Sequence, residues 1–206
     1  MFYRPGQDEH GLPRNPFNAL ITPRPIAWVS TRAADGTTNL APFSFFNGAA
    51  YEPPIVSIAF TGAKLGAHKG ERKDTLANIR ETKDFAVNIV PSALKDAMNA
   101  SAGHFGIGES EFAAAGVTEA PCETITAPRV AESPACFECR LVRLVELPNE
   151  GPGENVTVFG RVLGVHISES ILTDGFVDPT KFHPLARMGY LDYATITEVF
   201  AMSRPD

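Results

Sequence analysis

The sequence predicts a mainly β protein with a few short helices, whose mostly antiparallel strands form one closed or nearly closed barrel. Three observations predict this fold. Roughly six or seven β-rich runs follow one another along the 206 residues. Turn signals such as Asp35-Gly36 and the 148–153 segment separate several of them. Helical periodicity is confined to short stretches, and closing the sheet would remove its vulnerable edges.

Apolar alternation and punctuation residues place the elements along the chain. Residues 1–17 are rich in proline and are expected to be a surface segment, while residues 18–206 are expected to form a single domain. Ser92 is the expected N-cap of the second helix, and Gly116 is expected to close the third. The expected elements are strands 25–31, 38–46 and 54–60, helix 75–81, strand 85–90, helices 92–100 and 110–116, and strands 135–147, 156–168 and 193–202.

Composition excludes several classes of protein. Hydrophobic residues make up 44% of the chain and charged residues 20%, which is typical of a globular protein. The formal net charge of −6 argues against a nucleic-acid partner, because binding a phosphate backbone usually requires a basic face. No run is long and apolar enough to predict a membrane span, so no membrane partner and a cytoplasmic location are expected.

The sequence offers no motif for a metal centre or a catalytic nucleophile. Cys136 and Cys139 form a C-x-x-C pair on a predicted strand, where residues three apart point to opposite faces and would not converge on one ion. The five histidines show no H-x-x-x-H or H-E-x-x-H spacing, and no G-x-S-x-G segment is present. No metal site is therefore expected, and no catalytic residue is assigned.

A site for a flat anionic ligand is the chemistry that the sequence does favour. Planar apolar side chains occur in the first three β-rich runs, although each ring taken singly is more often part of a core. Lys73-Asp74-Thr75 then supplies an ammonium and a hydroxyl where a helix begins, and helix N-termini favour phosphate groups. Alternation predicts that Phe43 and Phe45 share one face and that Phe46 lies on the other.

Several segments in a fixed order resemble the flavin reductase-like domain family. They are ITPRPIAWVST, DG, NLAPFSFFN, EPPIVSIAF, KDTLANIRETKDFAVNIV and HPLARMGYLDYA, and together they extend over about residues 18–205. The resemblance implies an FMN-binding split β-barrel that acts as an FMN-dependent oxidoreductase. NADH or NADPH would be the electron donor, a small molecule the substrate, and a monooxygenase that receives reduced flavin a further partner.

The resemblance also implies which residues hold FMN, near a homodimer interface. Lys73 and Thr75 would hold the phosphate at the helix start, in agreement with the electrostatic argument. The residues expected to edge the ring system of the flavin are Trp28, Ser30, Ser44, Phe45, Phe46 and Asn47. His183 and Arg187 stand in the last matching segment, where either would meet an anionic group or serve a structural role.

Two departures from the family pattern leave alternative functions open. Asn155 stands where many members that reduce free flavin have a histidine, and Tyr190 stands where a glycine is common and would narrow the cleft. The leading expectation is an NAD(P)H-dependent flavin reductase or a related flavoprotein reductase. One alternative is an FMN enzyme that acts on a specific small organic substrate without reducing free flavin. Another is a non-enzymatic flavin- or heme-binding protein.

Overall fold

The computed structural model describes residues 1–62, 74–103, 105 and 110–205. It contains the helices α1 Phe17–Leu20, α2 Asp74–Thr82, η2 Ser92–Leu94, α3 Lys95–Ala100, α4 Glu111–Ala115, η3 Glu169–Ile171 and α5 Pro179–Phe182. The long strands are β2 Ala27–Arg32, β3 Thr38–Phe43, β4 Phe46–Tyr51, β5 Pro54–Phe60, β6 Asp84–Ile89, β9 Ala135–Leu147 and β10 Asn155–Ile167. The short strands are β1 Arg24–Pro25, β7 Glu119–Ala120, β8 Arg129–Val130, β11 Leu172–Thr173, β12 Phe176–Val177, β13 Leu185–Arg187 and β14 Tyr193–Thr195.

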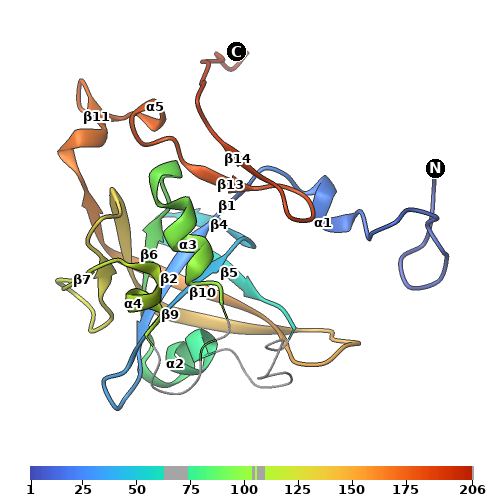
Figure 1. Cartoon of the computed structure of the whole chain (residues 1–206), viewed down its shortest axis with the longest axis horizontal. Helices are drawn as coiled ribbons and strands as arrows, with labels where there is room; N and C mark the ends of the chain where they lie inside the picture. The colour runs from blue at the N-terminus through green and yellow to red at the C-terminus, as the bar shows by residue number, and fades with distance from the viewer. Residues whose placement is uncertain (63–73, 104, 106–109, 206) are drawn as a thin grey trace.

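Seven strands form one antiparallel sheet in the order β3-β2-β6-β9-β10-β5-β4. The sheet curls so that its ends approach each other, and β3 runs directly into β4 through Ser44 and Phe45 (Figure 1). At this seam, the Ala59 amide donates to the Phe45 carbonyl at 2.8 Å, and the Phe43 and Phe60 rings lie 4.5 Å apart. The prediction of a mainly antiparallel split β-barrel is confirmed.

The barrel encloses one apolar core, and its outer face is covered by two smaller clusters. Alternation along β9 explains the division, because Cys139 points into the barrel while Cys136 faces outward. Helices α3 and α4 cover Trp28 and Leu40 on one side of the sheet. The 121–128 loop covers Cys136 with Ile125 and Ala127. No helix in the described part of the chain could cross a membrane.

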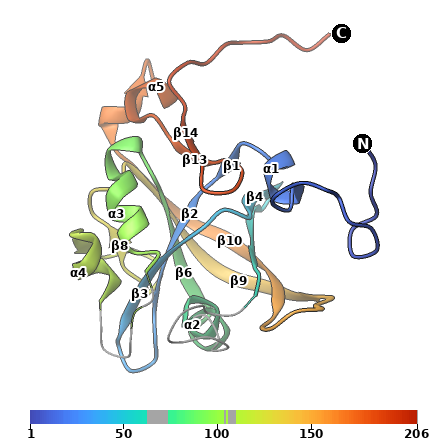
Figure 2. The same cartoon turned by 45° about the vertical axis from the view of Figure 1, so that its right-hand side comes forward.

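Two strand predictions were wrong, and both fail at a sheet edge. The expected strand 38–46 is two strands, because the chain leaves one edge of the sheet at Ser44 and joins the other at Phe46. Alternation is interrupted there, so Phe43 and Phe46 both pack on the barrel core instead of lying on opposite faces. The expected strand 193–202 ends at Thr195, because β13, its neighbour in the described part of the sheet, has three residues. The tail beyond extends away from the barrel (Figure 2).

The helix predictions hold with one correction. Helix α2 begins and ends within one residue of its expected bounds, and α4 closes at Gly116 in a left-handed conformation. Ser92 does not cap α3: it opens the short turn η2, and Pro91 occupies the cap position. The four-residue α1 was not predicted, because the prolines around it obscure any periodicity.

Gly160 allows β10 to pass over the core ring of Phe85. An added Cβ would lie 2.2 Å from Phe85 Cζ, and that ring is fully buried. We expect Gly160→Ala to lower the free energy of unfolding by about 1–3 kcal/mol through overpacking. Urea unfolding measures this change. Gly48→Ala is the matched control, because nothing lies within 4 Å of its added Cβ; equal losses in the two variants would contradict the explanation.

Candidate functional site

A pocket of about 380 Å³ lies where β3 leaves the sheet. Its walls come from the β3–β4 break, the small sheet β1-β13-β14, the segment before α1 and helix α3. The residues that line it are Asn15, Asn18, Arg24, Ile26, Pro42, Phe43, Ser44, Phe45, Ala59, Thr61, Met98, Ala102, Arg187, Tyr190 and Tyr193. Its volume lies in the range of small-molecule binding sites.

Two arginines line this pocket from neighbouring strands, because Arg24 on β1 pairs directly with Arg187 on β13. Arg24 is buried and donates to the carbonyl oxygens of Asn18 at 2.5 Å, Ile21 and Met188 at 2.9 Å. Burial lowers its pKa, and the nearby charge of Arg187 lowers it further. Within the described residues neither guanidinium has a carboxylate partner, so no carboxylate of this part of the chain compensates their positive charge.

Aromatic rings complete the pocket. The Arg24 guanidinium lies 5.6 Å from the centre of the Phe45 ring, and that of Arg187 lies 4.4 Å from the centre of the Tyr193 ring. Tyr190 adopts a left-handed φ of 55°, a conformation that favours glycine, and its carbonyl accepts a hydrogen bond from Arg187. The arrangement of cations and flat apolar surfaces suits a planar ligand that carries acceptor oxygens or negative charge.

Among the predicted site residues, Ser44, Phe45 and Arg187 are brought together in this pocket. Phe46 and Asn47 follow on β4, where Phe46 packs on the core and Asn47 is exposed. Trp28 and Ser30 are completely buried and already bonded: Trp28 Nε1 donates to Ser101 Oγ at 2.8 Å, and Ser30 Oγ donates to the Pro128 carbonyl at 2.5 Å. Their side chains therefore lie outside the pocket, and their predicted contact with a flavin stays a prediction.

The predicted phosphate-binding site lies at the other end of β3. Lys73 is outside the described residues. Thr75, in the first turn of α2, is buried, and its hydroxyl donates to Asn39 Oδ1 at 2.5 Å. Asn39 lies near the start of β3, whereas Phe43 at its end lines the pocket. A single ligand that reaches both places must therefore be elongated along this strand.

Glu111 anchors this polar cluster, since Asn39 Nδ2 donates to its Oε1 at 2.6 Å. Burial raises the pKa of Glu111 despite these hydrogen bonds. At pH values between the ordinary pKa of a glutamate and this raised pKa, the folded protein therefore binds more protons than the unfolded chain. This group makes the free energy of unfolding fall as pH rises through that interval. We expect Glu111→Gln to flatten that part of the curve of unfolding free energy against pH. A steeper decline in the variant than in the unmodified protein would contradict the prediction.

The predicted residue His183 and the family departure Asn155 lie elsewhere. His183 caps α5 with φ 49°, and its Nδ1 lies 3.3 Å from the Ile196 carbonyl oxygen, outside the pocket lining. Asn155 Nδ2 donates to the Pro148 carbonyl at 2.9 Å, so this side chain braces the turn between β9 and β10. Neither position contacts the pocket.

Arg24 stands directly before the first expected strand, and the sequence does not show what it contacts. Its partners are backbone carbonyls that are distant in sequence, such as that of Met188, and no side-chain pattern reveals them. Asn18, Thr61 and Tyr193 were also not predicted as pocket residues. The glycine at position 189 is one sequence signal for this part of the site. An added Cβ would lie 2.6 Å from Ala19 Cβ, so this glycine permits the close approach of α1 to the pocket rim.

The fold and the pocket at its seam define a split β-barrel protein, and comparison with known proteins gives its family. The model of the flavin reductase like domain matches residues 19–186. The chain belongs to this flavin reductase-like family. An uncharacterised protein of Halalkalibacterium halodurans is 35% identical over 187 residues, which cover 90% of this chain and 87% of the relative.

Two solved structures extend the comparison. Nitrilotriacetate monooxygenase component B from Bacillus cereus superposes with a TM-score of 0.87 at 30% identity, covering 98% of both chains. The 2-nitrobenzoate 2-nitroreductase NbaA from Pseudomonas fluorescens superposes with a TM-score of 0.78 at 29% identity, covering 92% of this chain and 88% of that one. The family and these neighbours indicate an oxidoreductase.

Proposed function

We propose that this chain is an FMN-binding, NAD(P)H-dependent flavin reductase. The observation that carries the proposal is the pocket at the β3–β4 break, where two guanidiniums adjoin the predicted flavin residues Ser44 and Phe45 and have no carboxylate partner among the described residues. A bound flavin would supply hydride transfer, while the protein would fix its orientation and its exposure to substrates.

The donor set of the pocket fits a flavin ring system. Phe45 offers a flat apolar surface, Ser44 a hydroxyl, and Arg187 charged N–H donors. The ring carries carbonyl oxygens on one side only, and positive charge near that side would favour its electron-rich reduced form. The phosphate would lie near Lys73 and Thr75 at the start of α2, so the cofactor would extend along β3.

A partner enzyme and a second subunit belong to the same proposal. The structural neighbour from Bacillus cereus is component B of a monooxygenase, which supports a role in supplying reduced flavin to a separate oxygenase. Homodimer formation is supported by large apolar side chains that the monomer leaves exposed around the pocket rim and on the C-terminal tail. They include Leu191 at 75% and Phe200 at 82% exposure.

A second candidate function is an FMN enzyme that reduces a specific small organic substrate and releases no reduced flavin. The similarity to a 2-nitrobenzoate 2-nitroreductase favours it, because that protein is named for such a substrate. Tyr190, which lines the pocket where the family often has glycine, would restrict the size of that substrate.

Steady-state oxidation of NADH and of NADPH, with FMN added as a diffusible acceptor, separates the two candidates. A flavin reductase is expected to show turnover that rises and saturates with FMN. Negligible turnover with free FMN, together with NADH or NADPH oxidation that requires an aromatic nitro compound as the electron acceptor, would favour the second candidate. Absence of both activities in folded protein would contradict the proposal.

A further inference from the structure

The outer face of the β9–β10 ladder carries two potential metal ligands, His166 and Glu138. His166 on β10 lies directly opposite Cys136 on β9, and Glu138 is two residues further along β9 on the same face. Glu138 is only 1% exposed, which is unusual for a carboxylate. This face is covered by the 121–128 loop, which packs Cys122 beside Cys136.

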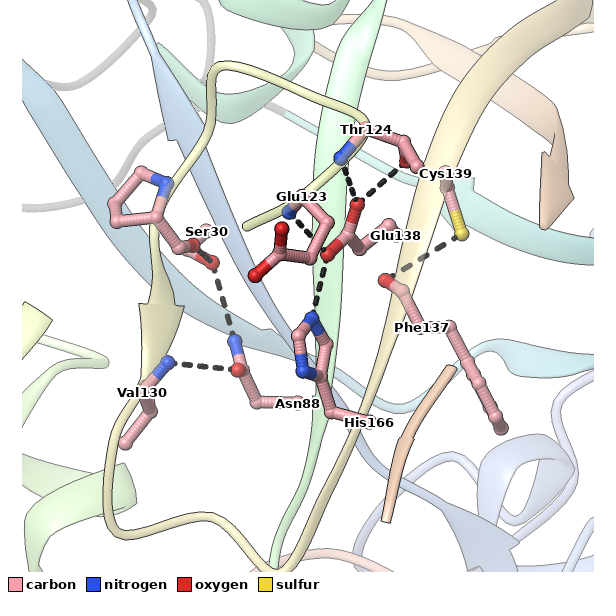
Figure 3. A network of polar contacts seen from close by, with 10 residues as sticks. Ser30, Asn88, Glu123, Thr124, Val130, Phe137, Glu138, Cys139 and His166 are labelled. Atoms are coloured by element: carbon pink, nitrogen blue, oxygen red, sulfur yellow. Dashed lines mark hydrogen bonds and ion pairs between the residues drawn. The ribbon is translucent and has the colours of Figure 1, made fainter. Parts of the chain in front are cut away.

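The loop also fixes the orientation of the buried carboxylate. The amides of Glu123 and Thr124 donate to Glu138 Oε1 at 2.7 Å and Oε2 at 2.6 Å, and the Thr124 hydroxyl donates to Oε2 at 2.5 Å (Figure 3). His166 Nε2 lies 2.5 Å from Oε1 on the remaining side. These contacts fix the orientation of the carboxylate and keep the imidazole beside it, as hydrogen bonds around ligands do in metal sites.

Cys122 completes the cluster. A sulfur of Cys122, a carboxylate oxygen of Glu138 and a ring nitrogen of His166 all lie within 4.8 Å of one another. Zinc bond lengths of about 2.0–2.3 Å imply separations of roughly 3.3–3.8 Å between ligands at a tetrahedral ion. The sulfur, oxygen and nitrogen are thus close enough to share one ion after small side-chain movements. The Glu138–His166 contact of 2.5 Å must widen, and the partly exposed His166 side chain has room to do so.

We propose that Cys122, Glu138 and His166 form a binding site for a zinc-class divalent metal ion. Thiolate, imidazole and carboxylate together are the donor set that Zn²⁺ prefers, and three protein ligands leave a fourth position for water. On binding, the Cys122 thiol would release its proton to solvent, the His166 proton would move to Nδ1, and Nε2 would exchange its contact with Glu138 for the metal. The ion would tie the 121–128 loop to β9 and β10.

This site is separate from the proposed flavin site. None of its three ligands lines the pocket at the β3–β4 break. Cys139 of the C-x-x-C pair cannot join this cluster, because it points into the barrel core on the opposite face of β9. Cys122, fourteen residues before Cys136, is brought to the outer face by the 121–128 loop.

Cobalt(II) titration of the chelator-treated full chain tests the site, because a cobalt–thiolate bond gives a charge-transfer band in the near ultraviolet. We expect that band to appear and saturate at one equivalent. Zn²⁺ at about 100 times its dissociation constant should raise the Tm of the same protein by roughly 5–10 °C.

Substitutions locate the ligands. Cys122→Ser should abolish the charge-transfer band, and His166→Gln should weaken cobalt binding at least tenfold, with folding checked by circular dichroism. Cys139→Ala is the matched control and should keep both the band and the Tm shift. Absence of a band and of a Tm shift in the unmodified protein would overturn the proposal. So would a band that survives Cys122→Ser or disappears only in Cys139→Ala.

Discussion

Replacing Glu138 with alanine should lower the free energy of unfolding of the metal-free protein by about 3–5 kcal/mol, the scale found when one partner of a buried pair is removed. The substitution leaves two backbone amides, one hydroxyl and one imidazole of the described network without their acceptor. Each donor then loses its partner at a position where the carboxylate had excluded water. Urea unfolding in the presence of a chelator measures the loss without any contribution from bound metal.

Glu123→Ala is the matched control for this measurement. Its side chain is exposed, and only its backbone amide serves the network, so the same formal charge is removed while every hydrogen bond to Glu138 remains. We expect a change within about 0.5 kcal/mol for this variant. Similar losses in both variants would show that net charge, and not the buried network, determines the stability of this face.

Arg187→Met should weaken FMN binding by about 1.5–3 kcal/mol, the scale of a hydrogen bond with a charged partner, or roughly 10- to 150-fold in affinity. Its guanidinium lies over Tyr193 in the pocket and lacks a carboxylate partner among the described residues, so a ligand acceptor would meet an available charge. Methionine keeps most of the apolar stem and removes that charge. Fluorescence titration of FMN measures the change.

Arg161→Met is the control, because this arginine lies exposed on β10 and does not line the pocket. FMN affinity should be the same as in the unmodified protein. If both variants bind FMN equally well, Arg187 is not part of the flavin site, and the pocket cations serve another anionic ligand.

The long strands could be predicted from sequence because alternation over many residues leaves little freedom. The 135–147 run has the observed bounds of β9, and the 156–168 run matches β10 within one residue at each end. The break at Ser44 could not be predicted, because Pro42, the nearby proline, lies within β3 and does not end it. The chain changes strand partners at Ser44, and strand partners are long-range information. The end of β14 at Thr195 could not be predicted for the same reason.

Sequence reasoning found part of the candidate site. The segment around Ser44 and Phe45 and the late segment with Arg187 do converge on one pocket, although they are far apart in the chain. The pairing of Arg24 with Arg187 depends on strand register, which residue types alone do not specify. The cluster of Cys122, Glu138 and His166 was missed because its ligands come from a loop and two strands at irregular spacing.

The absorbance spectrum of the purified protein, recorded after FMN addition and desalting and again after anaerobic addition of NADH or NADPH, tests the central claim most directly. The proposed function predicts flavin bands that remain with the protein and bleach when the nicotinamide is added. A folded protein that retains no flavin absorbance would contradict FMN binding at the pocket. Retained bands that neither NADH nor NADPH bleaches would contradict the reductase activity.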